Sequence, residues 1–185
     1  YGLYVIDENN MESHGTNRSR IIGCPQIPGS RPEWEKACME RIKALYNRDK
    51  NRTCVVCWSL GNESLGGEIP KKMYKWIKEQ DPSRFVHFEC AGDPNEKNLS
   101  DVQSHMYAKP WDCEEYAVTQ RDGRPYILCE FTHAMGNSCG STQEYTYLWD
   151  KYPCLQGGFV WDWVDQAIMT TDENGTEYLA YGGGF

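Results

Sequence analysis

Residues 54–63 read Cys-Val-Val-Cys-Trp-Ser-Leu-Gly-Asn-Glu, and residues 126–133 read Tyr-Ile-Leu-Cys-Glu-Phe-Thr-His. Each stretch is a short apolar run that leads into a glutamate, Glu63 in the first and Glu130 in the second. Nearly continuous apolar runs are typical of parallel strands that are covered on both faces. Because α/β enzymes place their chemistry at the carboxyl ends of such strands, these stretches predict an α/β fold with two carboxylates at one edge.

Strand-like and helix-like segments alternate along the rest of the chain. Apolar runs predict strands at 2–7, 54–60, 85–89, 101–106, 126–130 and 157–162. Helices are expected over 32–48, 69–79 and 141–151, with Ser30 as N-cap of the first and a capping box at the start of the third. Residues 108–124 are expected to form a loop with at most a short helix. The alternation suits a doubly wound sheet or part of a (β/α)₈ barrel, which normally needs about 250 residues.

Composition narrows the classes of partner. A net charge of −8 and a pI of about 5.0 argue against nucleic acid and anionic membrane surfaces. Seven Trp and twelve Tyr either fill a core or line a sugar-binding cleft, and both readings stay open. Nine Cys, an odd number with several inside apolar runs, argue against a disulfide framework. The cysteines favour a cytoplasmic location, with the periplasm as the alternative.

Further polar residues follow the ends of predicted strands. Glu12 and His14 lie two positions apart after the first strand, so in an extended segment both side chains point the same way and could bind a divalent cation. A solvated loop is the alternative for this pair. The Asn62 amide, next to Glu63, could hold a sugar hydroxyl. Hydrolysis of a glycosidic bond requires two carboxylates, and Glu63 and Glu130 on two strands of one sheet would supply them.

Four segments of the sequence resemble motifs of a known family. Residues 7–15 read Asp-Glu-Asn-Asn-Met-Glu-Ser-His-Gly, 58–64 read Trp-Ser-Leu-Gly-Asn-Glu-Ser, 127–138 read Ile-Leu-Cys-Glu-Phe-Thr-His-Ala-Met-Gly-Asn-Ser, and 155–166 read Leu-Gln-Gly-Gly-Phe-Val-Trp-Asp-Trp-Val-Asp-Gln. They resemble the metal-site segment, the acid/base motif, the nucleophile motif and the final barrel strand of glycoside hydrolase family 2, in particular of its bacterial lactose-cleaving β-galactosidases. The resemblance covers nearly the whole chain.

The resemblance implies a (β/α)₈ TIM barrel, incomplete, with its strands 3 to 8 present and the first two missing. All of residues 1–185 would belong to this catalytic domain, without the family's flanking β-sandwich domains. It implies that Glu63 is the acid/base and Glu130 the nucleophile, and that Glu12, His14 and Glu63 bind the active-site Mg²⁺. Positions matching the galactose site are Asn62, Met106, Tyr107, His133 and Trp161. The family's Na⁺ site would lie mostly outside the chain.

The implied activity is that of a retaining exo-β-galactosidase, which removes terminal non-reducing β-D-galactose from galactosides such as lactose by double displacement. The parent protein would be a homo-oligomer. The alternatives are another family-2 glycosidase, a β-glucuronidase or β-mannosidase, or a barrel fragment that is inactive in isolation. A glucuronate carboxylate calls for Lys or Arg, and the four motif segments contain neither. Gly184 stands where the family usually has Asp.

Overall fold

The structure, a computed structural model, describes residues 2–18, 27–89, 98–119, 123–134, 139–162 and 167–181. Its elements are β1 (Val5–Glu8), α1 (His14–Arg18), α2 (Pro32–Asp49), β2 (Val55–Ser59), α3 (Glu68–Gln80), β3 (Phe85–His87), β4 (Gln103–Met106), α4 (Pro110–Thr119), β5 (Tyr126–Phe131), α5 (Thr142–Lys151), β6 (Leu155–Val160), β7 (Ala167–Thr171) and β8 (Glu177–Tyr181). The six predicted strands are confirmed as β1–β6, although β6 begins and ends two residues earlier than expected. The expected Gly184 departure lies outside the described residues.

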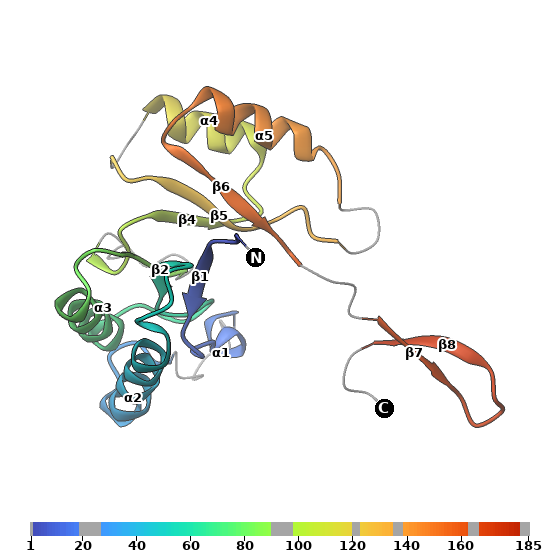
Figure 1. Ribbon diagram of the computed structural model, residues 1–185, viewed down its shortest axis with the longest axis horizontal. Helices are drawn as coiled ribbons and strands as arrows, with labels where there is room; N and C mark the ends of the chain where they lie inside the picture. Colours follow the sequence, from blue (N-terminus) through green and yellow to red (C-terminus); the bar gives the residue numbers. More distant parts are fainter. Residues whose placement is uncertain are drawn as a thin grey trace.

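The strands form two parallel sheets and one hairpin. The order is β1-β2-β3 in the first sheet and β4-β5-β6 in the second, while β7 and β8 pair antiparallel. Helices α2 and α3 pack beside the first sheet and α4 and α5 beside the second, with the hairpin standing apart (Figure 1). Among the described residues none of the sheets is closed, so the arrangement of these strands as strands 3 to 8 of a barrel stays a prediction.

Each parallel sheet has its own hydrophobic core against its helices. The first contains Ile42, Trp58, Leu60, Met73, Ile77, Val86 and Phe88, and the second contains Cys113, Ala117, Tyr126, Leu128, Phe131, Tyr145 and Leu148. Side chains link the two sheets: His87 Nε2 lies 2.8 Å from Ser104 Oγ, and Arg124 Nη1 donates to the backbone of Ser100 at 3.1 Å. The functional edge is therefore built on two separately packed halves.

A buried polar cluster around Asp81 contacts β2 at Trp58 and at Val55. Asp81 accepts hydrogen bonds from Trp58 Nε1 at 3.0 Å, Ser83 Oγ at 2.6 Å and Arg84 Nη1 at 2.7 Å. Arg84 also lies over the indole of Trp58 and donates from Nε to Val55 O at 2.8 Å. Burial alone would raise the pKa of Asp81, but these hydrogen bonds outweigh it and hold that pKa well below its usual range.

Helices α2 and α5 begin within one residue of the predicted positions, but the capping predicted for each is wrong. Arg31, and not Ser30, is the N-cap of α2, and its side chain makes no capping hydrogen bond. Ser30 Oγ instead accepts from Glu68 N at 3.1 Å and so caps the distant helix α3. At α5 the predicted capping box is absent, because Ser141 has a left-handed backbone (φ 54°) and not the extended conformation that a capping side chain needs.

Two elements go beyond the sequence prediction. Helix α4 occupies ten residues of the segment expected to be mostly loop, and it begins at Pro110, a residue suited to a first turn. The β7–β8 hairpin was not predicted. Its turn is held by Asp172 Oδ1, which accepts from Asn174 N at 2.9 Å and Thr176 N at 2.8 Å, with Gly175 at φ 81°. The Asn-Gly pair at 174–175 is the signal that could have revealed it.

The carboxyl end of β2 passes very close to the segment after β1. Gly61 has φ 146°, and a Cβ built on it would lie 2.3 Å from the carbonyl oxygen of Met11. Asn62 N donates to that same oxygen at 3.0 Å, and Glu12 and Asn62 form a parallel bridge. Only glycine permits this approach, which places the Glu12 segment directly beside the Glu63 segment.

We expect Gly61→Ala to destabilise the protein and to lower its activity, because the added methyl group forces Met11 away. Gly123 provides a control, since it also has positive φ (73°) but open space around its would-be Cβ. Gly123→Ala should cost about 1–2 kcal/mol of backbone strain, and Gly61→Ala about 1–3 kcal/mol more through overpacking. Urea unfolding of both variants measures the difference. Equal losses would contradict the close approach.

We expect Asp81→Asn to lower the free energy of unfolding at neutral pH by about 2–4 kcal/mol, because the charge that holds Arg84 is lost. The folded pKa of Asp81 lies below the ordinary value of 3.8, so its stabilisation is fully present above that pH and is lost as the pH falls below it. The gap to the unsubstituted protein should therefore stay constant from pH 7 to about 5. A gap that already closes over that range, or Glu79→Gln on the exposed face of α3 matching Asp81→Asn, would refute this.

Candidate active site

The predicted nucleophile lies at the end of β5 in contact with the end of β4. Tyr107 N donates to Glu130 O at 2.8 Å, and the Tyr107 hydroxyl donates to Glu130 Oε2 at 2.5 Å. The ring of His133 lies 5.9 Å from that of Tyr107, centroid to centroid. Three predicted site residues are thus brought together, and the Tyr107 hydroxyl fixes the position of one Glu130 oxygen.

The three predicted metal ligands also converge. Donor atoms of Glu12, His14 and Glu63 all lie within 4.8 Å of one another. His14 Nδ1 contacts Glu63 Oε2 directly and lies 3.8 Å from Glu12 Oε1. The segment that carries Glu12 and His14 is held next to the segment after β2 by a hydrogen bond, since Ser64 Oγ accepts from Ser13 N at 3.0 Å. Two carboxylates and one imidazole form a donor set that suits a divalent cation.

Electrostatic effects connect the two groups of residues. Burial raises the pKa of Tyr107, and its hydrogen bond to Glu130 and the negative charges of Glu130 and Glu63 raise it further. The pKa of Tyr107 therefore responds to both predicted catalytic carboxylates, Glu63 after β2 in the first sheet and Glu130 on β5 in the second. Ile6, Glu8 and His87 of the first sheet and Ile127, Cys129 and Phe159 of the second line one cavity, so the two sheets face a common region.

Three residues at this edge have left-handed backbones that non-glycine residues rarely adopt. The φ angles are 39° at Glu63, 53° at Tyr107 and 44° at Thr132. Tyr107 and Thr132 directly follow β4 and β5, and Glu63 lies four residues after the end of β2. Such conformations cost about 1–3 kcal/mol each and gather at functional sites, where the surrounding structure holds them. No sequence signal marks these positions.

The remaining predicted sugar-site residues are placed less uniformly. Trp161 lies beside the nucleophile segment, because its N donates to Phe131 O at 3.2 Å and its O accepts from Ala134 N at 2.8 Å. The indole is 43% exposed, so it is available to stack on a ligand. The Asn62 backbone is fixed beside Glu12 as described.

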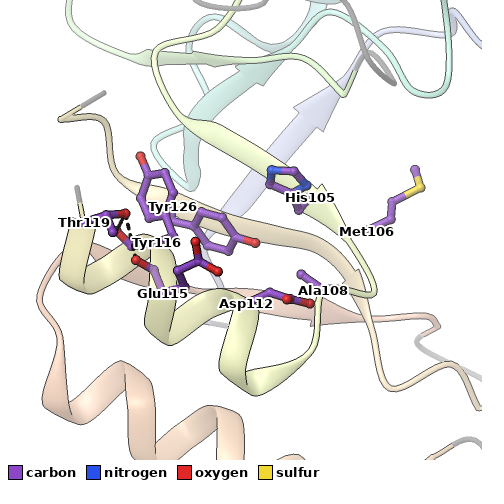
Figure 2. Close-up of a pocket in the computed structure, with 8 residues that line it drawn as sticks. All are labelled: His105, Met106, Ala108, Asp112, Glu115, Tyr116, Thr119 and Tyr126. Carbon is purple, nitrogen blue, oxygen red and sulfur yellow. Dashed lines mark hydrogen bonds between the residues drawn. The ribbon is translucent and has the colours of Figure 1, made fainter. Parts of the chain in front are cut away.

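Met106 is paired with Glu130 in the β4–β5 register, yet its side chain also borders a different cavity. This cavity, about 370 Å³, lies between β4, β5 and α4 and is lined by His105, Met106, Ala108, Asp112, Glu115, Tyr116, Thr119 and Tyr126. Figure 2 shows His105 above Tyr126, with the acidic side chains rising from α4. None of Glu63, Glu130, Glu12 or His14 lines it, so it is distinct from the catalytic edge.

Sequence reasoning did not place Glu8 in the site. Ser59 Oγ donates to Glu8 Oε2 at 2.7 Å. Desolvation raises the pKa of Glu8 despite this hydrogen bond, and the neighbouring charges of Glu12 and Glu130 raise it further. Glu8 is thus a further carboxylate that interacts electrostatically with both Glu12 and Glu130. Its position at the end of β1, equivalent to that of Glu63 after β2, is the signal that could have found it.

Comparisons with known proteins agree on one family. All of residues 1–185 match the family described as glycosyl hydrolases family 2, TIM barrel domain. The β-galactosidase of Priestia megaterium is 52% identical over 186 residues, covering 100% of this chain and 18% of that protein. β-Galactosidase BgaC of Bifidobacterium adolescentis is 48% identical over 194 residues, again covering 100% and 18%. The chain therefore spans about a fifth of the length of these curated relatives.

Solved structures share the fold at low sequence identity. A family-2 glycosyl hydrolase from Bacteroides cellulosilyticus has a TM-score of 0.54 and 19% identity, covering 70% of this chain and 17% of that one. β-Glucuronidase 2 of Bacteroides uniformis has a TM-score of 0.53 and 15% identity, covering 76% and 23%. No helix within the described segments is long and apolar enough to cross a membrane. From its full-length family match and the identity to its curated relatives, the chain belongs to the TIM-barrel domain of glycosyl hydrolase family 2, a family of glycosidases.

Proposed function

We propose that the protein containing this chain is a retaining exo-β-galactosidase. The proposal is supported by two groups of residues at the carboxyl ends of parallel strands, Glu130 with Tyr107 and His133 and Glu63 with Glu12 and His14. The curated relatives at 52% and 48% identity carry the name β-galactosidase, which supports galactose as the sugar. Trp161 offers an exposed ring face on which a pyranose could stack.

In the proposed first step Glu130 attacks the anomeric carbon while Glu63 protonates the departing glycosidic oxygen. A galactosyl-enzyme forms, with its new bond to a Glu130 oxygen. In the second step Glu63 takes a proton from water, which attacks the anomeric carbon and releases Glu130 as a carboxylate. Retention calls for the two carboxyl groups to lie about 5–5.5 Å apart. The Tyr107 hydroxyl supports this scheme because it holds one Glu130 oxygen in place.

We further propose that Glu12, His14 and Glu63 bind Mg²⁺. Their donor atoms are close enough to surround one ion, and two carboxylates provide the oxygen ligands that Mg²⁺ prefers. When bound, the ion would offset negative charge beside the acid/base. The chain's own contribution is to keep His14 against Glu63 and Glu12 beside Asn62. The Na⁺ site, the flanking β-sandwich domains and assembly into a homo-oligomer remain part of the proposal for the whole protein.

The first rival is a β-glucuronidase or β-mannosidase. Fold likeness to β-glucuronidase 2 does not decide the sugar, because it holds at only 15% identity. The second rival is a barrel piece that is inactive by itself. Assaying the 185-residue chain beside a protein with the full length of its relatives, on nitrophenyl galactoside, glucuronide and mannoside, separates these cases. We expect the full-length protein to prefer the galactoside.

In that full-length protein we expect Glu130→Gln to lower kcat at least about 10⁴-fold with little effect on folding, because the nucleophile is lost and the shape is kept. Glu63→Gln should still form the galactosyl-enzyme from an aryl galactoside with a good leaving group, since such a group needs little protonation. Intact-protein mass spectrometry detects the intermediate. Glu40→Gln, on the exposed face of α2, is the control and should be fully active. Loss of the first step in both site variants would contradict the assigned roles.

The magnesium proposal predicts that chelation lowers the activity and that added Mg²⁺ restores it. A Glu12→Gln, His14→Ala double variant should lose this response, because only Glu63 then remains of the three ligands. Activity titrated against free Mg²⁺ provides the measurement, with Glu115→Gln as a carboxylate control outside the ligand group. A double variant that still responds to Mg²⁺ at the same concentration would remove the idea.

A further inference from the structure

A second group of potential metal ligands joins the first parallel sheet to the second and contains none of the predicted catalytic residues. His87 at the end of β3, Glu89 just beyond it and Cys129 on β5 have donor atoms that all lie within 4.8 Å of one another. His87 is 3% exposed and Glu89 8%. His87 and Cys129 also line a cavity of about 170 Å³ together with Ile6, Glu8, Ile127 and Phe159. No residue is shared with the group formed by Glu12, His14 and Glu63.

We propose that His87, Glu89 and Cys129 form a binding site for a thiophilic divalent cation, with Zn²⁺ as the fitting ion. A thiolate, an imidazole and a carboxylate are the three ligand types that Zn²⁺ takes in proteins, whereas Mg²⁺ avoids sulfur. Cys129 Sγ lies 3.3 Å from Glu89 Oε2. Tetrahedral Zn²⁺ with its usual bond lengths separates a sulfur and an oxygen ligand by about 3.5 Å, so this edge of the site already has nearly the required length.

The hydrogen bonds around His87 leave the correct nitrogen for a metal. Ser59 Oγ donates its single hydrogen to Glu8 Oε2 at 2.7 Å, so toward His87 Nδ1, 2.9 Å away, it acts as the acceptor. The proton of the neutral ring is then on Nδ1, and Nε2 keeps its lone pair. Histidines that bind metals typically donate their other N–H to an oriented acceptor in this way. Glu8, Ser59 and His87 form that arrangement across β1, β2 and β3.

Ser104 supplies the remaining polar group. Its Oγ lies 2.8 Å from His87 Nε2 and donates to the Nε2 lone pair in the metal-free structure. A bound ion would take the place of that hydrogen and leave a neutral oxygen nearby as a fourth ligand or as a partner for a bound water. Charge also balances, because one divalent cation neutralises one thiolate and one carboxylate. This balance lowers the cost of burying both anions in the interior.

An ion in this position would lie close to the chemistry. Cys129 directly precedes Glu130 on β5, and His87 belongs to the sheet that carries Glu63. The metal would therefore join the two sheets through coordinate bonds, beside the His87–Ser104 contact. Its occupancy should raise the unfolding temperature of the protein, as for any ligand that binds only the folded state.

The test uses Co²⁺ as a spectroscopic probe in a protein with the full length of its relatives, after removal of bound metal. One equivalent should produce the near-ultraviolet absorption of a thiolate–cobalt bond. Cys129→Ser should abolish that absorption, while the control Cys113→Ser, a buried thiol of the α4 core, should keep it. The Glu12→Gln, His14→Ala variant should also keep it, because the proposed magnesium site contains no sulfur. Absence of the absorption in the unsubstituted protein overturns the proposal, as does its persistence in Cys129→Ser.

Zinc affinity, measured by competition with a chromophoric chelator, adds a graded test. His87→Gln should weaken Zn²⁺ binding by more than about tenfold through loss of a ligand, and Ser59→Ala by about tenfold through loss of ring orientation. Unfolding midpoints without metal show whether each variant folds, and Ser59→Ala changes no ligand. Unchanged affinity in folded His87→Gln contradicts the site, whichever way the cysteine variant behaves.

Discussion

The contact between Gly61 and Met11 is the constraint on which the functional edge depends. A backbone without a side chain lets the end of β2 lie against the segment that follows β1. The backbone hydrogen bond from Asn62 and the bridge to Glu12 both require that separation. Because Glu63 comes two residues later, its carboxylate is delivered to His14 by main-chain geometry.

The same edge concentrates negative charge in a chain that already carries a net charge of −8. Each acidic group described there has a particular partner: Glu130 has the Tyr107 hydroxyl, Glu8 has Ser59, and Glu63 has His14. These partners explain how several carboxylates can share a small region. A cation or a neutral, hydroxyl-rich ligand is compatible with this field, and an anionic ligand is not.

Much of the fold and the site could be predicted from the sequence, because the strands are apolar runs and the two predicted catalytic glutamates lie at or shortly beyond the ends of two of them. All six parallel strands, helix α2 with buried Cys38, Ile42 and Leu45, and the convergence of Glu12, His14 and Glu63 were expected. Features decided by distant contacts were not. Ser30 caps a helix almost forty residues away, and the large apolar side chain of Trp34 on α2 belongs to a residue that is 41% exposed. The left-handed backbones at Glu63 and Tyr107 likewise depend on packing that no local pattern encodes.

The two hydrophobic cores have a consequence for how the site fails. One core is built from side chains between Met11 and Phe88 together with Leu99, and the other from side chains between Cys113 and Leu155, so each can behave as its own cooperative folding unit. Glu63 belongs to the first unit and Glu130 to the second. Slight loosening between the units would separate the carboxylates while leaving helix content and both cores intact. In a full-length protein with the proposed activity, loss of activity on heating should therefore precede loss of helix content, because contacts such as that between His87 and Ser104 join the two units.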